Sequence, residues 1–214
     1  MKDLLDTELQ NFLINILPEK DDLELEIQKY AEENHVSIVE EEVANFLKII
    51  TKIKKPLRIL EIGTGLGYST INIAKAISNE GKITTIELLA KRMEKAAYFI
   101  EKSGEKDKVE LIVGDGREII NDFKESFDMI FLDAAKGQYG KFLQKCDTLL
   151  KEDGIIIADN VLINGWVVNL QYPERRKKTM VMNMRKFLEE FKDNQKYELT
   201  LIPLGDGVAL IRKR

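Results

Sequence analysis

The chain has 214 residues, close to the length of one α/β domain with an appendage. Hydrophobic residues make up 44% and charged residues 33%, a composition that excludes a disordered or fibrous chain. The 33 basic and 37 acidic residues give a net charge of -4, so a nucleic-acid partner would have to be bound by a local basic patch. Cys146 is the one cysteine, which excludes a disulfide framework and predicts a reducing, cytoplasmic location.

The amino-terminal segment lacks an apolar run of signal-peptide length, and no stretch of about 18 apolar residues occurs, so we expect neither secretion nor a membrane span. His35 is the one histidine, which argues against His-based triads and multi-histidine metal sites. Its position after Glu33 and Asn34 favours a structural role at a helix end.

Helical periodicity dominates the first part of the chain. Apolar residues recur every three or four positions in segments 4–17, 22–34 and 40–53, which predicts three amphipathic helices. The apolar stripe on segment 4–17 is expected to be buried. We therefore predict a single domain over residues 1–214, with a helical appendage (1–55) before the core (56–214).

The core segment predicts a sheet. Runs rich in β-branched residues span Arg58–Ile62, Lys82–Glu87, Val109–Val113, Phe127–Asp133, Gly154–Asp159 and Tyr197–Pro203. Their alternation with helical stretches predicts a parallel sheet with helices on both faces. Gly205-Asp206-Gly207 connects Leu199–Leu204 to Val208–Arg212 and is too short for a parallel crossover, so a seventh strand should be reversed. This seven-stranded α/β arrangement resembles the class I methyltransferase (Rossmann-like) fold.

A glycine-rich turn follows the first predicted strand. Gly63, Gly65 and Gly67 precede Tyr68 and Ser69, where a helix begins, and such glycines let the backbone approach a ligand closely. Glu87 ends the second strand, 20 residues after Gly67, where a carboxylate can accept hydrogen bonds from ribose hydroxyls. A plain tight turn and a solvated strand-end carboxylate are the alternatives.

Two details favour S-adenosylmethionine over a dinucleotide. The turn lacks the two-residue gap that precedes the third glycine of the dinucleotide pattern. Gly114-Asp115-Gly116 closes the third strand, where the methyltransferase fold meets adenine. Ser69, at the start of the helix, can bind the amino-acid end of the cofactor, whose carboxylate the helix N-terminus favours.

Oxygen-bearing side chains end two neighbouring strands. Asp133 follows the fourth strand and Asp159-Asn160 the fifth, and the carboxyl ends of such strands converge. Two carboxylates and an amide oxygen suit Mg²⁺, with Ca²⁺ or Mn²⁺ as alternatives, although a lone Asp at a strand end is more often a helix cap. Lys136 would lie beside the same opening. A nearby cation favours its neutral amine, which could accept a proton from a hydroxyl, and a solvated lysine is the alternative.

These motifs together carry a family resemblance. The turn at Leu60–Ser69, Glu87, Gly114–Gly116, Phe131–Lys136 and Ala158–Val161 look like those of the metal-dependent O-methyltransferases related to catechol and caffeoyl-CoA methyltransferases. The resemblance covers nearly the whole chain. It implies S-adenosylmethionine and Mg²⁺ as cofactors and a homodimer as the assembly. It also implies the cofactor-binding residues Glu61, Gly63, Gly65, Tyr68, Ser69, Glu87, Asp115, Gly116 and Asp133.

Three segments look most like those of bacterial tRNA 5-hydroxyuridine methyltransferases: Asp133–Tyr139, the basic run Arg175-Arg176-Lys177-Lys178, and Pro203–Ala209. That resemblance implies methylation of the wobble-position 5-hydroxyuridine to 5-methoxyuridine. Val39 matches the segment that lines the methionine end of the cofactor in those enzymes, although Ser37 stands where they have proline.

The residues alone leave the acceptor open. Catechols and 5-hydroxyuracil both present adjacent oxygens that a metal held by Asp133, Asp159 and Asn160 could chelate, with Lys136 as the base and the methyl donor held in line. The basic run could contact tRNA phosphates or could be a solvated helix face, and the resemblance favours RNA over a small catechol-like or caffeoyl-CoA-like substrate. A non-catalytic cofactor sensor on the same fold is less expected, because the metal ligands and the glycine turn are retained.

Overall fold

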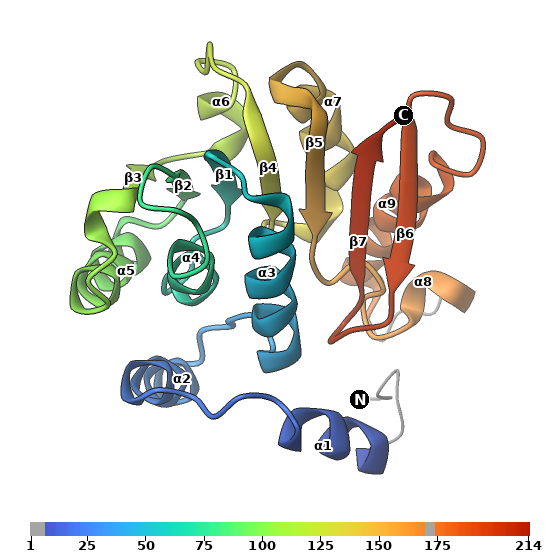
Figure 1. The fold of residues 1–214 in the computed structure, drawn as a ribbon. Helices are drawn as coiled ribbons and strands as arrows, with labels where there is room; N and C mark the ends of the chain where they lie inside the picture. The colour runs from blue at the N-terminus through green and yellow to red at the C-terminus, as the bar shows by residue number, and fades with distance from the viewer. Residues whose placement is uncertain (1–6, 170–173) are drawn as a thin grey trace.

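A seven-stranded sheet forms the centre of the computed structural model, which describes residues 7–169 and 174–214 (Figure 1). The strands are β1 (Arg58–Ile62), β2 (Lys82–Glu87), β3 (Val109–Val113), β4 (Phe127–Leu132), β5 (Leu150–Ala158), β6 (Tyr197–Ile202) and β7 (Val208–Lys213). Their order in the sheet is β3-β2-β1-β4-β5-β7-β6. Since the order runs outward in both directions from β1 and β4, the carboxyl ends of these two strands define the switch point where α/β sheets bind ligands.

Strand directions confirm the reversed hairpin. Strands β1 to β5 pair in parallel, whereas β7 is antiparallel to both β5 and β6. Strand β5 begins at Leu150, four residues before the predicted Gly154. The register against β4 slips there, because Phe127 is opposite Leu150 while Met129 is opposite Ile155. The charged residues Lys151, Glu152 and Asp153 at this irregular start interrupt the apolar pattern, which is why the sequence predicted too short a strand.

Helices cover both faces of the sheet (Figure 1). They are α1 (Thr7–Asn15), α2 (Asp22–Asn34), α3 (Glu41–Lys54), α4 (Tyr68–Ala74), α5 (Ala90–Lys102), α6 (Gly116–Ile119), α7 (Tyr139–Leu149), α8 (Trp166–Asn169) and α9 (Lys178–Glu189). Short 3-10 turns are η1 (Lys106–Lys108), η2 (Lys136–Gln138) and η3 (Arg175–Lys177). None of the helices within residues 7–169 and 174–214 is long and apolar enough to cross a membrane.

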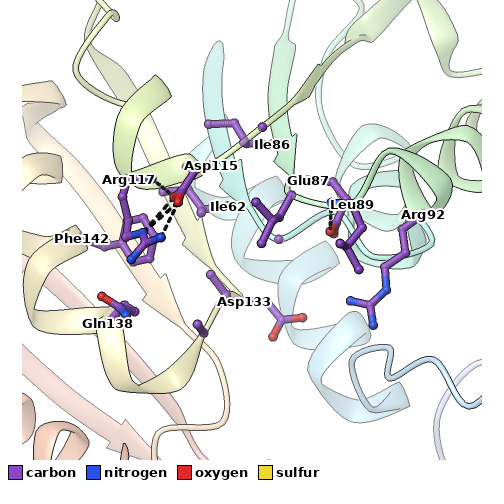
Figure 2. Close-up of a pocket in the computed structure, with 16 residues that line it drawn as sticks. Ile62, Ile86, Glu87, Leu89, Arg92, Asp115, Arg117, Asp133, Gln138 and Phe142 are labelled. Carbon is purple, nitrogen blue, oxygen red and sulfur yellow. Dashed lines mark hydrogen bonds and ion pairs between the residues drawn. The ribbon is translucent and has the colours of Figure 1, made fainter.

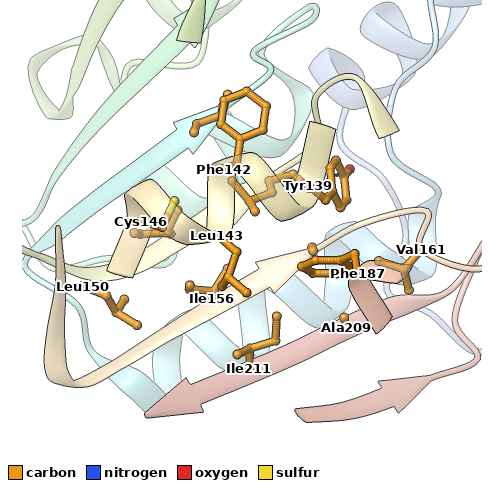
Figure 3. Close-up of a cluster of buried hydrophobic side chains, with 14 of the residues drawn as sticks. Tyr139, Phe142, Leu143, Cys146, Leu150, Ile156, Val161, Phe187, Ala209 and Ile211 are labelled. Atoms are coloured by element: carbon orange, nitrogen blue, oxygen red, sulfur yellow. Dashed lines mark hydrogen bonds between the residues drawn. The ribbon is translucent and has the colours of Figure 1, made fainter. Parts of the chain in front are cut away.

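The core has two halves, one on each face. On the first face, α7 and α9 bury Tyr139, Phe142 and Phe187 against Ile156 of β5 and Ile211 of β7 (Figure 3). On the other, α3 to α5 cover the sheet and α2 packs against α5, and the buried residues there include Ile27, Leu47, Phe99 and Phe131. Each half removes large apolar side chains from water, and this burial is the main stabilising contribution to the sheet and to the loops at its edge.

The ends of α2 follow from local chemistry. Asp21 accepts the backbone N–H of Glu24 at 2.8 Å, and the Glu24 side chain accepts the backbone N–H of Asp21 at 3.0 Å, which forms a capping box. His35 ends the helix in the left-handed region, with φ 52°. The structure thereby confirms the predicted role of His35 at a helix end.

The expected burial of the first helix is wrong for this chain taken alone. Leu9, Phe12 and Ile16 on its apolar stripe are 46%, 60% and 63% exposed. Helix α1 packs beside α3, away from the sheet, so the core cannot cover its outer face. Residues 4–6 of the predicted helix lie outside the described residues.

Candidate active site

The glycine turn after β1 brings the ends of β1 and β4 together. Gly63 adopts φ +107°, and its N–H donates to the Ile86 carbonyl at 2.9 Å. A Cβ atom at Gly63 would lie 2.0 Å from the Asp133 carbonyl oxygen, closer than any side chain permits. Glycine is therefore required for β1 to approach the strand end that carries Asp133.

Glu61 lies fully buried under this turn. Its carboxylate accepts hydrogen bonds from the hydroxyls of Ser69 at 2.5 Å, Thr85 at 2.6 Å, and Thr70. Burial raises the pKa of Glu61 to about 7. Glu61 and Ser69 are therefore hydrogen-bonded to each other at the start of α4. Their contacts with a cofactor remain predictions.

A cavity of about 430 Å³ opens beside the turn (Figure 2). The predicted residues that line it are Gly63, Glu87, Asp115, Gly116 and Asp133. Apolar walls come from Ile62, Ile86, Leu89 and Phe142. This volume and mixed lining suit a small ligand with a flat apolar part and a few polar groups.

Two carboxylates in this cavity already have partners. Glu87 accepts the N–H of Gly65 at 2.9 Å and the N–H of Leu89 at 3.0 Å, one on each oxygen. Each oxygen retains a second lone pair, so Glu87 can shape the turn and still accept a hydrogen bond from a ligand. Asp115 accepts Arg117 backbone and side-chain N–H groups, which hold the pKa of its carboxyl at about 2 (Figure 2).

Val39, Gly65 and Tyr68 are not among the residues that line this cavity. The side chains of Val39 and Tyr68 are 4% and 3% exposed and belong to the core on the α3 face. A cofactor contact by Tyr68 would therefore come from its backbone. The segment before Val39 borders the turn, because a Cβ atom at Gly65 would lie 3.8 Å from the Ser37 carbonyl oxygen.

The structure brings the two predicted metal-binding carboxylates together. Burial raises the pKa of Asp133 to about 6, with Lys136 opposing the shift and Glu40 adding to it. Burial also raises the pKa of Asp159 well above its ordinary value, and the charges of Asp133 and Glu40 raise it further. Like charges gathered in a poorly solvated place favour a bound cation.

The donor set fits a hard cation. Asp159 is 1% exposed, its Oδ1 accepts the Asn160 N–H at 2.7 Å, and its buried Oδ2 has no hydrogen-bond partner among the described residues. Asn160 follows directly in the left-handed region, with φ 54°. Residues 7–169 and 174–214 contain no group of three or more His, Cys, Asp or Glu side chains able to hold a metal. The predicted metal site has only two carboxylates, because its third ligand is the amide of Asn160. The observation that supports this site is the buried Oδ2 of Asp159, which has no hydrogen-bond partner among the described residues.

Lys136 lies in η2, after Asp133, and its Nζ is 3.4 Å from Asp206 Oδ2. Asp206 is in the β6–β7 turn and also accepts the Asn164 N–H at 2.5 Å. The sequence identified Asp206 only as a turn residue, because it lies between Gly205 and Gly207, and it did not single out Glu40. No local sequence signal indicates that either carboxylate is near Lys136.

The predicted RNA-binding residues lie on η3 and the first residue of α9. Arg175, Arg176 and Lys178 are exposed, and Lys177 is partly buried with its Nζ 5.1 Å from the centre of the Trp166 ring. Glu174 forms ion pairs with Arg176 and, at 3.9 Å, with Lys177. Helix α9, whose first residue is the last of this basic segment (175–178), packs against η2, which carries Lys136.

The sheet order, the reversed strand and the ligand cavity at the switch point define a class I methyltransferase fold. Solved structures confirm it over the full length of the chain. The O-methyltransferase TomG from Streptomyces achromogenes, crystallised with S-adenosylmethionine, matches with a TM-score of 0.86 and 25% identity over 100% of this chain and 99% of that one. The O-methyltransferase from Bacillus cereus, in complex with S-adenosylhomocysteine, gives a TM-score of 0.86 and 26% identity over 97% and 98%.

The chain belongs to the O-methyltransferase family, whose sequence model matches residues 18–214. A caffeoyl-CoA O-methyltransferase from Populus kitakamiensis is 32% identical over 196 residues, covering 87% of this chain and 82% of its own length. A tapetum-specific methyltransferase from Arabidopsis thaliana is 30% identical over 198 residues, covering 89% of this chain and 83% of its own. The predicted family is therefore confirmed.

Proposed function

We propose that this protein transfers a methyl group from S-adenosylmethionine to the 5-hydroxyl of 5-hydroxyuridine at the wobble position of tRNA, giving 5-methoxyuridine in a Mg²⁺-dependent reaction. The observation that carries the tRNA part is the basic segment 175–178, which leads into the helix that packs against the Lys136 loop. The chemistry rests on Lys136 lying near Asp133, which is partly buried, and near the buried Asp159.

The cavity in Figure 2 is the proposed S-adenosylmethionine site. Glu87 would accept the ribose hydroxyls, since its oxygens keep free lone pairs. The apolar walls formed by Ile86 and Phe142 suit a flat purine ring. Backbone N–H groups at the start of α4 would face the carboxylate of the methionine end. S-adenosylmethionine and S-adenosylhomocysteine in the two similar crystal structures support this assignment.

Asp133, Asp159 and Asn160 would hold Mg²⁺ through their side-chain oxygens. When bound, the ion supplies Lewis-acid stabilisation of the negative charge that develops on the acceptor oxygen. Asp133 also lines the proposed cofactor cavity, so this strand end borders both the methyl donor and the acceptor. Such an arrangement orients two reactants with one rigid element.

Lys136 is the proposed general base, and its Nζ would take the proton of the acceptor hydroxyl. Asp206 orients this amine through its Oδ2, 3.4 Å away. Asp206 is in turn held by the Asn164 N–H, so the base is positioned from the β6–β7 turn and from the loop after β5. Helix α9 supports the loop of the base, where the Asn183 side chain donates to the Gly137 carbonyl at 3.1 Å.

A small catechol-like or caffeoyl-CoA-like acceptor is the second candidate. It is favoured by the names of the similar caffeoyl-CoA O-methyltransferases and by the pairing of Glu174 with part of the basic segment. Both acceptor classes present adjacent oxygens, so the carboxylates alone do not discriminate between them.

The deciding experiment measures methyl transfer from labelled S-adenosylmethionine to tRNA carrying 5-hydroxyuridine, in parallel with a catechol and caffeoyl-CoA panel. We expect tRNA to be methylated with at least a tenfold higher kcat/KM, and the label to be found as 5-methoxyuridine. Turnover of catechols without turnover of tRNA would replace the proposal with the second candidate.

The basic segment is tested by changing Arg175, Arg176, Lys177 and Lys178 together to Gln. If these residues bind phosphates, tRNA affinity should fall and its salt dependence should flatten, with a slope change somewhat below one for each phosphate that is no longer neutralised. Methylation of free 5-hydroxyuridine should change less than that of tRNA. An unchanged salt slope would identify the segment as a solvated helix end.

The homodimer and the cytoplasmic location are further proposals. The exposed apolar residues Leu9 and Phe12 on α1, and Ile16 directly after it, offer a surface that a second copy could cover. Sedimentation of the protein and of a Phe12→Glu variant would test this, since a dimer formed there should dissociate in the variant.

A further inference from the structure

Glu40 occupies the N-cap position of α3 but does not act as a cap. Its backbone is extended, with φ -63° and ψ 156°, and its side chain makes no capping hydrogen bond to α3. Glu41 and Glu42 in the first turn already complement the positive end of the helix. The Glu40 carboxylate therefore does not cap α3, the role that its position in the sequence suggests.

The side chain of Glu40 turns instead toward the turn between β6 and β7. Its Oε2 lies 3.0 Å from the Cβ position of Gly205, in the turn that carries Asp206. Its charge acts on Asp133 and Asp159, and the charges of Asp206 and Lys136 act on Glu40 in return. Glu40 thus joins the side of the site where the acceptor must bind.

The fold leaves one oxygen of this carboxylate without a partner, while the carboxylate also accepts a hydrogen bond from the backbone N–H of Glu40 itself. Oε2 is buried and lacks a hydrogen-bond partner within the part of the chain that the structure describes. The nearby Lys136 amine is paired with Asp206. A buried, unpartnered carboxylate oxygen is costly, and such local violations are typical of binding sites, where a ligand supplies the missing group.

We propose that Glu40 determines acceptor specificity by accepting a hydrogen bond from the ring N–H next to the oxygens of the acceptor. The inference rests on the proposed function. In 5-hydroxyuracil the carbonyl beside the 5-hydroxyl is followed by the imide N3–H, whereas a catechol carries C–H at the corresponding place. A carboxylate there binds a hydroxypyrimidine and disfavours a catechol, because only the former satisfies it.

The test compares two anticodon stem-loop RNAs, one with 5-hydroxyuridine and one with its N3-methyl derivative, which lacks the donor. We expect wild-type protein to prefer the first RNA about 100-fold in kcat/KM. Glu40→Ala should reduce this preference to a few-fold, because it removes the acceptor and makes room for the methyl group. Glu40→Gln, which keeps an acceptor oxygen, should retain part of it.

Glu42→Ala is the matched control, since it removes a carboxylate two residues away and should keep the wild-type preference. A preference that is equal in wild type and Glu40→Ala would overturn the inference while leaving the proposed function intact. If wild type methylates neither RNA but acts on catechols, the proposed function itself fails.

Binding provides a second readout without turnover. In the presence of S-adenosylhomocysteine, anisotropy should show the 5-hydroxyuridine RNA binding wild type at least tenfold more tightly than the N3-methyl RNA, and Glu40→Ala binding both alike. Mn²⁺ affinity should be within threefold of wild type in Glu40→Ala. If Glu40→Ala instead loses Mn²⁺ affinity and its turnover of catechols falls to the same extent, the inference is overturned, because Glu40 would then contribute to metal binding.

Discussion

The carboxylates on the proposed cofactor side of the site and those on its proposed acceptor side differ in which groups satisfy their hydrogen bonds. On the cofactor side, Glu61 accepts three hydroxyls, Glu87 accepts two backbone N–H groups, and Asp115 is paired with Arg117. On the acceptor side, Asp159 and Glu40 each keep a buried oxygen without a partner among the residues described. The carboxylates of the first side are paired within the chain, whereas each of these two on the second side leaves one oxygen that a bound group could satisfy.

Buried carboxylates therefore have two different roles in this site, one in supporting the backbone and one in binding ligands. Paired carboxylates fix the backbone of the glycine turn and of the strand ends, so the cofactor cavity is formed before any ligand enters. Unpartnered carboxylates leave a local excess of negative charge that a cation and a hydrogen-bond donor would relieve. Lys136 and Asp206 are paired with each other.

The largest effect is expected at Asp159. Replacing it with Ala should lower kcat by roughly 1000-fold or more, since several kcal/mol of metal-dependent stabilisation are lost. S-adenosylhomocysteine affinity, measured by calorimetry, should stay within a few-fold, because the cofactor cavity is on the other side. Asp153→Ala, in an exposed part of the same strand, is the control. Full activity in excess chelator would contradict the metal assignment.

Gly63 joins the two sides, and Gly63→Ala should destabilise the protein by about 3 kcal/mol or more, because its Cβ would collide with the Asp133 carbonyl oxygen. Gly104→Ala is the matched control, since Gly104 also has positive φ, +78°, but its Cβ would meet nothing within 4 Å. We expect about 1 kcal/mol there. Urea unfolding measures both, and equal losses would show that backbone conformation alone sets the effect.

Glu61 should make the free energy of unfolding depend on pH. Its pKa is about 7 in the folded state against 4.5 ordinarily, so between these values the folded state holds a proton that the unfolded state has released. The stability contributed by Glu61 is therefore complete below about pH 4.5 and is lost as the pH rises through about 7.

Glu61→Gln cannot titrate, so wild type should lose up to about 3 kcal/mol relative to this variant between pH 5 and 8. Urea unfolding of both proteins without added metal checks this. A difference that does not change with pH would show that the hydroxyl groups around Glu61 stabilise its charged form.

The smallest of these effects is expected at Glu87. Glu87→Ala should weaken S-adenosylhomocysteine binding by about 1–3 kcal/mol, because the ligand and two backbone N–H groups lose a charged acceptor. Calorimetry measures it, with Glu80→Ala, exposed before β2, as the control. Unchanged affinity would mean that Glu87 only supports the turn.

The sequence by itself determined the sheet, the reversed strand and the convergence of Asp133 with Asp159. These features depend on local signals: β-branched runs, glycines with positive φ, and a turn too short for a crossover. The strand-end residues followed because parallel strands in this order end at the same edge. Their roles toward the metal and the cofactor stay predictions.

Only the tertiary structure decided which charges are paired. It placed Ser69, Thr70 and Thr85 around Glu61, turned Glu40 toward the hairpin of Asp206, and left the stripe of α1 exposed. Hydrogen-bond partners and burial depend on residues far apart in the chain that packing brings together. A periodic pattern reports which face of an element is apolar, but it carries no information on what that face, or a carboxylate beside it, will meet.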